Sequence, residues 1–305
     1  MFLQLPSSAI ALKGMRSCLS WWAFFFALLL SFTPLRADQV NETSVNRLPL
    51  VFGVYTHIRP TEMYRKMTPF LQYLRDDLAG RGIDVDLQMK IFPTYAGAIE
   101  ALSKGKIDFA RFGPVSYVLA KDKNPGLQLL AMESNGGSKL FNGVITVPKG
   151  SLMRSIEQLR GKRVAFGDSR STTGRYLPQA LLAGSGISSS DLGGHSYLGR
   201  HDKVAFAVAS GKYHAGAINE NTFNKYSVSK GLRKIAEFPS VTKPWIAREG
   251  LDFRIFHGLR DSLFGLKDKK VLKSIKRDGF LAAEDGDYDM IRNAIKAAEA
   301  FGSKQ

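Results

Sequence analysis

The chain has 305 residues, of which 44 % are hydrophobic and one is cysteine, and its formal net charge is +16. This length is enough for one large or two medium domains with their own cores, and a single cysteine excludes a disulfide scaffold and a cysteine-rich metal site. A basic excess favours an acidic ligand or surface, although positive charge bears on function only where it converges on a pocket.

The first 37 residues predict an export signal. Two basic residues precede an apolar run over residues 21–32, and the segment ends in the small residue Ala37, which suits cleavage. The run is shorter than the roughly 20 apolar residues of a spanning helix, and an uncleaved N-terminal anchor stays open as the alternative. We therefore expect a periplasmic protein, and because Cys18 lies within the signal, cleavage would leave it without a thiol.

A flexible lead-in is predicted over residues 38–47, followed by a first lobe over residues 48–139. Its strands are expected at 50–55, 85–92, 106–112 and 127–133, and its helices at 62–79, 96–103 and 115–121. Alternating strands and helices imply a parallel sheet whose ligands bind beyond the carboxyl ends of the strands. Tyr55, His57 and Tyr95 follow strands there, either as ligand contacts or as structural residues.

The stretch from Lys162 to Pro178, KRVAFGDSRSTTGRYLP, reads as a strand, a tight turn and a helix start. With Ser171 as the N-cap, the hydroxyls of Ser171, Thr172 and Thr173 lie beside N–H groups that have no partner within the helix. The helix dipole is positive at that end, so the place attracts anions. It is not a phosphate-binding P-loop, because the GxxxxGK[ST] pattern is absent.

Two arginines flank these hydroxyls. Arg170 and Arg175 add guanidinium groups that an ordinary helix cap does not need, which favours an anion site. The alternative is that Ser171 only caps its own helix.

This stretch belongs to a second lobe, predicted over residues 140–237. Its strands are expected at 141–147, 162–166, 195–198, 215–218 and 232–238, and its helices at 155–159, 174–183, 201–210 and 219–228. His201 opens one helix directly after Arg200, either as a site donor or as a capping neighbour. Residues 238–305 return to the first lobe, with further helices from Trp245 onward and the clearest at 288–300. Two lobes joined by two crossings predict a hinge and a cleft.

Three segments resemble the periplasmic binding proteins of phosphate, phosphite and phosphonate ABC transporters, the phosphonate-binding family. They are TYAGAIEALSKGKIDFARFGPVSYVLA (94–120), LRGKRVAFGDSRSTTGRYLPQALLAGSGI (159–187) and GRHDKVAFAVASGKYHAGAINENTF (199–223). They cover most of both lobes in the order that the family uses. The resemblance implies a type II periplasmic binding fold of class α/β: two lobes, each a mostly parallel sheet flanked by helices, joined by a two-strand hinge.

The resemblance also implies site residues. The phosphoryl-binding hydroxyls of the family correspond to Ser171, Thr172 and Thr173, its cleft tyrosine to Tyr95, and the histidine that opens a later helix to His201. A second aromatic residue, often Tyr in the family, is Phe141 here, which removes a hydroxyl.

The far end of the ligand departs from members that bind aminoalkyl phosphonates, which place carboxylates there. This chain has Glu220 between two asparagines, and Lys243 offers a cation where an acid is expected. Repulsion between two like charges at about 4 Å costs about 4 kcal/mol at an effective dielectric near 20, which disfavours 2-aminoethylphosphonate. Arg170, Arg200 and Lys243 instead favour a compact or doubly charged oxyanion such as phosphate, phosphite or a simple alkylphosphonate.

The sequence therefore predicts an exported, monomeric solute-binding protein without cofactor, metal or catalytic residue. It captures a phosphorus oxyanion for an ABC permease or another membrane receptor and does not bind nucleic acid. Sensing for a separate receptor kinase is one alternative. The other is a phosphoryl hydrolase with Ser171 or Thr173 as nucleophile and His201 and Asp202 as base, although the strained GxSxG turn is missing and an aspartate directly after its histidine rarely orients that ring.

Overall fold

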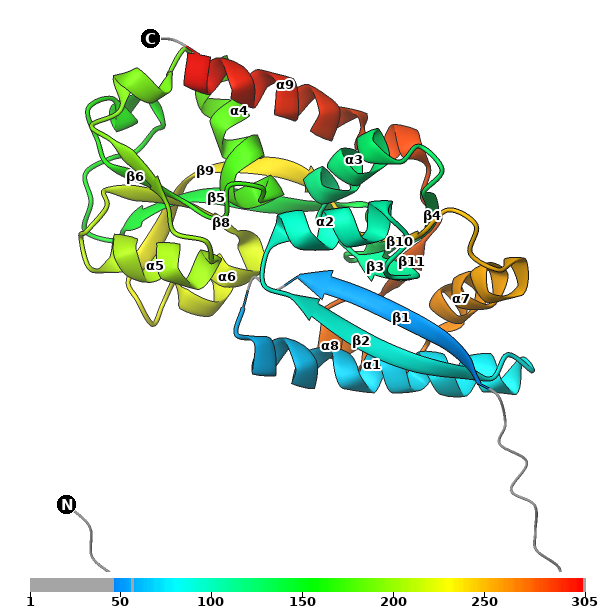
Figure 1. Ribbon diagram of the computed structural model, residues 1–305. Coiled ribbons are helices and arrows are strands. Elements are labelled where there is room, and N and C mark those ends of the chain that lie inside the picture. Colours follow the sequence, from blue (N-terminus) through cyan, green and yellow to red (C-terminus); the bar gives the residue numbers. More distant parts are fainter. Residues whose placement is uncertain (1–46, 56–57, 304–305) are drawn as a thin grey trace, which may run out of the picture. The chain divides into compact units, whose positions relative to one another are not determined.

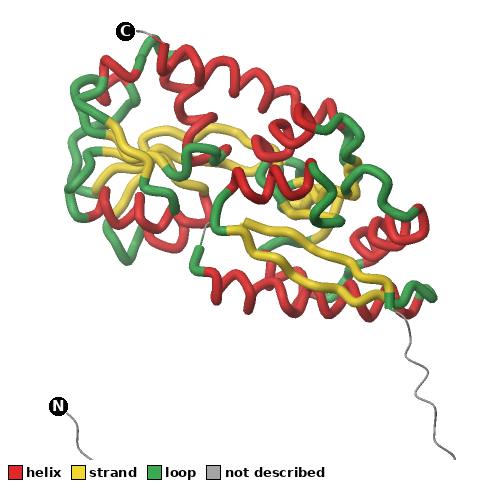
Figure 2. The backbone as a smooth tube through the Cα atoms, viewed as in Figure 1, coloured by secondary structure: helices red, strands yellow, loops and turns green. Residues whose placement is uncertain are grey.

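The computed structural model describes residues 47–55 and 58–303. The predicted export signal with Cys18, the lead-in up to residue 46, and His57 lie outside the described residues. Within the described part, two sheets flanked by helices form a mixed α/β architecture (Figures 1 and 2). None of the described helices is both long enough and apolar enough to cross a membrane.

The lobe I sheet has six strands in the order β11-β4-β10-β3-β1-β2. β1 pairs in parallel with β2 and β3, whereas β10 runs antiparallel to β3 and β4, and β11 antiparallel to β4. The bounds of these strands are β1 (Leu48–Tyr55), β2 (Val85–Phe92), β3 (Phe109–Arg111), β4 (Gln128–Ser134), β10 (Pro244–Ala247) and β11 (Gly279–Leu281).

The lobe II sheet has five strands in the order β7-β6-β8-β5-β9. β6 is parallel to β7 and β8, and β5 is antiparallel to β8 and β9. The bounds are β5 (Leu140–Pro148), β6 (Val164–Phe166), β7 (His195–Tyr197), β8 (Ala215–Asn219) and β9 (Leu232–Val241).

Each sheet is mostly parallel, as the sequence predicts: β1, β2, β3 and β4 run in one direction in lobe I, and β6, β7, β8 and β9 do so in lobe II. The exceptions are β10 and β11 in lobe I and β5 in lobe II. The structure corrects one prediction, because the segment from Trp245, where further helices were expected, begins in β10 in the middle of the lobe I sheet. Trp245 is fully buried there, so tertiary packing decides the conformation of this short apolar run.

The helices cover both faces of the sheets. In lobe I, α1, α7 and α8 pack on one face of the sheet, and α2 and α3 on the other (Figure 1). α1 buries the stripe that Met63, Met67, Phe70 and Leu74 form at helical spacing. The bounds are α1 (Pro60–Gly80), α2 (Tyr95–Ser103), α3 (Pro114–Lys123), α4 (Leu177–Gly184), α5 (His201–Ala209), α6 (Glu220–Tyr226), α7 (Phe253–Gly265), α8 (Lys269–Ile275) and α9 (Asp289–Ser303).

The two lobes are joined where the chain crosses between the sheets twice, at residues 134–140 and 241–243. The crossings lie side by side, because the Thr242 N–H donates to the Lys139 carbonyl at 2.8 Å and the Glu133 N–H to the Lys243 carbonyl at 3.0 Å. Residues 238–305 were predicted to return to the first lobe, but α9 at their end packs against the second. This helix packs along α4 of lobe II (Figure 1), where the Phe301 ring meets Phe166 edge-on.

Candidate functional site

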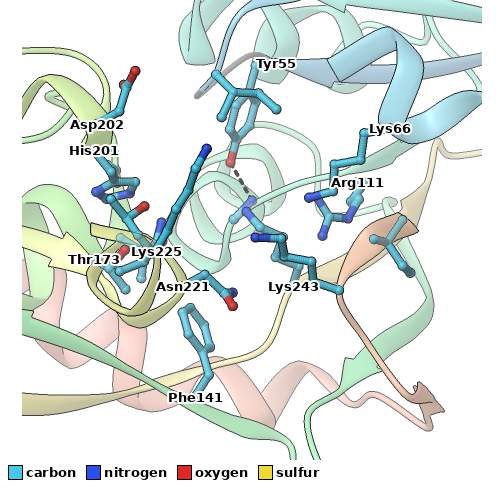
Figure 3. A pocket seen from close by; sticks show the side chains of 18 of the residues that line it. Tyr55, Lys66, Arg111, Phe141, Thr173, His201, Asp202, Asn221, Lys225 and Lys243 are labelled. Atoms are coloured by element: carbon cyan, nitrogen blue, oxygen red, sulfur yellow. Dashed lines mark hydrogen bonds between the residues drawn. The ribbon is translucent and has the colours of Figure 1, made fainter. Parts of the chain in front are cut away.

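A cavity of about 160 Å³ lies between the lobes, with walls from both. Eight of the eleven residues predicted from the sequence line it: Tyr55, Tyr95, Phe141, Ser171, Thr172, Thr173, His201 and Lys243. Figure 3 shows Thr173 and His201 on one side and Lys66, Arg111 and Lys243 on the other.

Helix starts dominate the lining. Because the first N–H groups of a helix have no partner inside it and the helix dipole is positive there, each start favours negative charge. The first residues of four helices and of one π-helical turn, η2 (Thr172–Tyr176), face the cavity. They are Tyr95 of α2, Pro114 of α3, Thr172 and Thr173 of η2, His201 of α5, and Asn221 and Thr222 of α6.

The three predicted hydroxyls differ in their hydrogen bonds. Ser171 is the N-cap, and its Oγ accepts from the Gly174 N–H at 3.1 Å, while the residue also lines the cavity. The Thr172 hydroxyl lies across the lobe boundary, where it accepts from the Val115 N–H of α3 at 3.0 Å. The Thr173 hydroxyl forms no hydrogen bond with a described residue, although only 4 % of Thr173 is exposed, and is therefore available to a ligand.

Two tyrosines complete this side of the cavity. The rings of Tyr55 and Tyr95 stack with centroids 3.7 Å apart. The Tyr55 hydroxyl accepts from the Gly113 N–H and from the Ser116 hydroxyl, and the Tyr95 hydroxyl bonds the side chain of Ser171. Burial raises the pKa of Tyr55 to about 12 and the pKa of Tyr95 well above its ordinary value. Both hydroxyls are therefore neutral at physiological pH.

Glycine is required where the turn after β6 meets the helix start. A Cβ on Gly174 would lie 2.9 Å from both the Gly167 Cα and the Ser171 Oγ. The close approach lets the Gly167 N–H donate to the Gly174 carbonyl at 2.7 Å. This contact fixes Ser171, Thr172 and Thr173 against the end of the strand.

His201 is buried at the start of α5, with 6 % of its surface exposed. Burial, followed by the charge of Lys243, lowers the pKa of His201 to about 4, so the imidazole is neutral at pH 7. Its Nδ1 atom has no partner in the part of the chain that the structure describes. A bound ligand can donate a hydrogen bond to this nitrogen, or its negative charge can favour protonation of the imidazole. Asp202 pairs with Arg200, with the Arg200 Nε 3.0 Å from Asp202 Oδ1, and so does not orient the ring as the hydrolase alternative requires.

Sequence reasoning missed several cations of the cavity. The lining contains six Lys or Arg residues and two Asp or Glu residues, so its formal charge favours an anion. Besides Lys243, the cations are Lys66, Arg111, Lys225, Lys276 and Arg277.

The structure does not place three predicted residues in the lining. Arg170 is exposed in the turn before Ser171, Arg200 is held by Asp202, and Glu220 lies outside the wall although both neighbouring asparagines line it. Arg175 also turns away, because its guanidinium donates to the Ser169 carbonyl at 2.6 Å and lies over the Tyr176 ring. The prediction of two guanidinium groups beside the hydroxyls is therefore wrong. In the described residues no cluster of three metal-ligating side chains occurs.

Residues 52–288 match the model of the family described as "ABC transporter, phosphonate, periplasmic substrate-binding protein". The chain belongs to this phosphonate-binding family. The sequence prediction of the family is thus confirmed, together with the two-sheet α/β fold of its solved members.

Curated members of the phosphonate-binding family are similar to this chain. The protein named "Probable ABC transporter phosphite binding protein PhnD1" of Prochlorococcus marinus is 28 % identical over 204 residues, which are 63 % of this chain and 66 % of that protein. The phosphate-import protein PhnD of Mycolicibacterium smegmatis is 26 % identical over 65 % of this chain and 71 % of that protein. The solved structure of P. marinus PhnD1 in complex with methylphosphonate superposes with a TM-score of 0.74 at 22 % identity, covering 83 % of this chain and 98 % of that one.

Proposed function

We propose that this chain is exported and captures a phosphorus oxyanion, namely phosphate, phosphite or a simple alkylphosphonate, for delivery to an ABC permease. The observation that carries the proposal is the convergence of neutral hydrogen-bonding groups on one cavity. The donor wall, defined here as Ser171, Thr172, Thr173 and His201, comes from lobe II. Tyr55 and Tyr95 of lobe I close its edge.

Neutral donors suit this task for a physical reason. Hydroxyl and backbone N–H groups at helix starts bind an anion without a full counter-charge and without protonating it. The buried Nδ1 of the neutral His201 adds an acceptor for a P–OH group. Sulfate carries no such proton at neutral pH, so the donor wall is expected to prefer the phosphorus oxyanion.

The relatives support the same ligand class. Their printed names include phosphite binding and phosphate import, and one solved neighbour holds methylphosphonate. Membership of a family of periplasmic substrate-binding proteins supports export and delivery to a permease. A cavity between two lobes that are joined by two short crossings supports closure around the ligand, and the closed form is what a membrane partner would recognise.

Calorimetry on the purified protein with phosphate, phosphite, methylphosphonate and sulfate tests the proposal. At least one phosphorus compound should bind, and sulfate should bind more weakly. Thr173→Val should weaken that binding by about tenfold or more, because a hydrogen bond to a charged group contributes about 1.5–3 kcal/mol. The substitution keeps the volume of the buried side chain and removes a hydroxyl that has no partner among the described residues.

Thr242→Val is the matched control. Thr242 is fully buried, its hydroxyl has no partner in the described part of the chain, and it does not line the cavity. This variant should bind like the unmodified protein. Heat with an unrelated solute and none with any phosphorus compound would overturn the proposal.

A further inference from the structure

The side of the cavity opposite the donor wall carries clustered positive charge. The cationic wall, defined here as Lys66, Arg111, Lys243 and Arg277, is formed by lobe I and the crossing that leads back to it. Figure 3 shows Lys66, Arg111 and Lys243 of this wall, and Arg277 shares the Glu133 carboxylate with Arg111. Its members come from α1, from the end of β3, from the segment before β10 and from the segment after α8. The fold therefore gathers four cations that are distant in sequence at one end of one cavity.

A buried carboxylate balances only part of this charge. Glu133 is fully buried, and its Oε1 accepts from Arg111 Nε at 2.5 Å while its Oε2 accepts from Arg277 Nε at 2.8 Å. The Trp245 Nε1–H also donates to Glu133 at 3.3 Å. One negative charge thus serves two guanidinium groups, which are rigidly held with side chains 3 % and 5 % exposed.

The two lysines of the cationic wall have no such partner. Within the described ranges, neither Lys66 nor Lys243 forms an ion pair or a hydrogen bond. Burial, followed by the charge of Arg111, lowers the pKa of each to about 7. The only counter-charge that acts on the two half-buried lysines among the named residues is Glu133, which already pairs with Arg111 and Arg277. An incompletely balanced charge away from water is unfavourable, and an anion placed between these lysines would relieve that cost. The cost of holding them there suggests that the wall serves a ligand.

The two walls meet at Gly113. A Cβ on this residue would lie 2.8 Å from the Tyr55 hydroxyl, 3.4 Å from the Thr172 Oγ1 and 3.9 Å from the Lys243 Nζ. The hydroxyls of Tyr55 and Thr172 are therefore neighbours of the Lys243 ammonium group. Arg111 and Lys66 lie beyond them on the cationic side (Figure 3). A phosphoryl group on the donor wall would direct its substituent towards the cationic wall.

We propose that, besides these simple oxyanions, the cavity binds phosphorus oxyanions that carry a second anionic group, a carboxylate or a second phosphoryl group, at the end opposite the phosphoryl group on the donor wall, and that it binds them more tightly. This inference rests on the proposed function, because it takes the donor wall as the phosphoryl site. A cavity of about 160 Å³ admits a small molecule of this kind. The cationic wall rejects a ligand whose second end is an amine.

Calorimetry at pH 7 with methylphosphonate, phosphonoacetate, pyrophosphate and 2-aminoethylphosphonate tests the second group. Phosphonoacetate or pyrophosphate should bind at least about tenfold more tightly than methylphosphonate, because each adds a charge-assisted contact. 2-Aminoethylphosphonate should bind more weakly than methylphosphonate. The two doubly anionic probes distinguish a carboxylate from a second phosphoryl group.

Lys66→Gln and Arg65→Gln form a matched pair on one turn of α1. Each removes one positive charge, but Lys66 lines the cavity whereas Arg65 is exposed outside it. Lys66→Gln should remove most of the difference in Kd between methylphosphonate and the doubly anionic ligand. It should leave the Kd of methylphosphonate within about threefold of its original value, since the donor wall is intact. Arg65→Gln should leave all affinities unchanged.

The outcomes separate this inference from the proposed function. Equal affinity for methylphosphonate and the doubly anionic probes would overturn the proposal of a second anionic group and leave the proposal of phosphorus oxyanion capture in place. Weakening of methylphosphonate and phosphonoacetate by the same factor in Lys66→Gln would also overturn the second anionic group alone. Failure of every phosphorus compound to bind would overturn both proposals.

Discussion

The donor wall and the cationic wall face one cavity but are stabilised in different ways. In the donor wall, neutral backbone N–H groups supply the partners: Ser171 caps its own helix, and Thr172 accepts from the Val115 N–H across the lobe boundary. In the cationic wall, a buried carboxylate does so, because Arg111 and Arg277 both pair with Glu133. One wall presents neutral hydrogen-bonding groups, the other full charges. The difference indicates that recognition of the phosphoryl group and of the rest of the ligand can be changed separately.

Removing the buried carboxylate of the cationic wall should have the largest effect, a loss of stability in the unliganded protein. Glu133→Gln leaves the buried Arg111 and Arg277 without their counter-charge, and loss of one partner from a buried ion pair costs about 3–5 kcal/mol. Urea unfolding should show this loss in the unliganded protein. Glu100→Gln is the control, because Glu100 pairs with Lys104 and Lys123 on the surface, where ion pairs contribute little. Equal loss in both variants would contradict the role given to Glu133.

The second largest effect is expected from a methyl group added where the two walls meet, which should weaken ligand binding. Gly113→Ala adds a Cβ 2.8 Å from the Tyr55 hydroxyl, and overpacking of this kind costs about 1–3 kcal/mol. We expect about a tenfold or larger rise in the Kd of methylphosphonate, measured by calorimetry.

Gly184→Ala, at the end of α4, is the control, because a Cβ there meets nothing within 4 Å. Unchanged affinity in Gly113→Ala would place the ligand away from this junction.

The smallest expected effect concerns the pH dependence of stability. The native pKa of Lys66 is about 7, whereas an unfolded lysine titrates near 10.4. Between these values the unfolded state binds more protons, so the buried lysine destabilises the protein fully below pH 7 and progressively less as the pH rises towards 10. The charges that face Lys66 are those of Arg111, Glu133, Lys276, Arg277 and Lys243.

Lys66→Met should therefore stabilise the unliganded protein by about 1–2 kcal/mol at pH 6 and by less at pH 9.5. Urea unfolding at the two pH values measures the difference. The same gain at both values would mean that burial does not hold the pKa of Lys66 down.

The donor wall was accessible from the sequence, and most of the cationic wall was not. Ser171, Thr172 and Thr173 stand next to one another after a short apolar strand, so one local pattern predicts their chemistry. Lys66, Arg111 and Arg277 are far apart in the chain, and only the tertiary fold brings them together. A signal for Lys66 exists, because it lies on the face of α1 that buries Met63 and Phe70, where a solvated lysine is not expected.

The fold shows the same division between local and long-range information. The alternation of strands and helices predicts two α/β lobes, because hydrophobic periodicity is a local property. β10 was missed since Pro244–Ala247 is a short segment whose strand conformation depends on β3 and β4 on either side. Arg170 and Arg200 were misplaced in the site because sequence proximity to a hydroxyl or histidine does not decide where a long side chain points. Arg200 instead pairs with Asp202 two residues away.

A crystal structure of the protein with methylphosphonate tests the central claim most directly. The account predicts phosphoryl oxygens within about 2.6–3.2 Å of the hydroxyls of Ser171, Thr172 and Thr173, with the methyl group directed towards Lys243. Phosphoryl oxygens held by Lys66 and Arg111, with the donor wall facing only solvent, would contradict it.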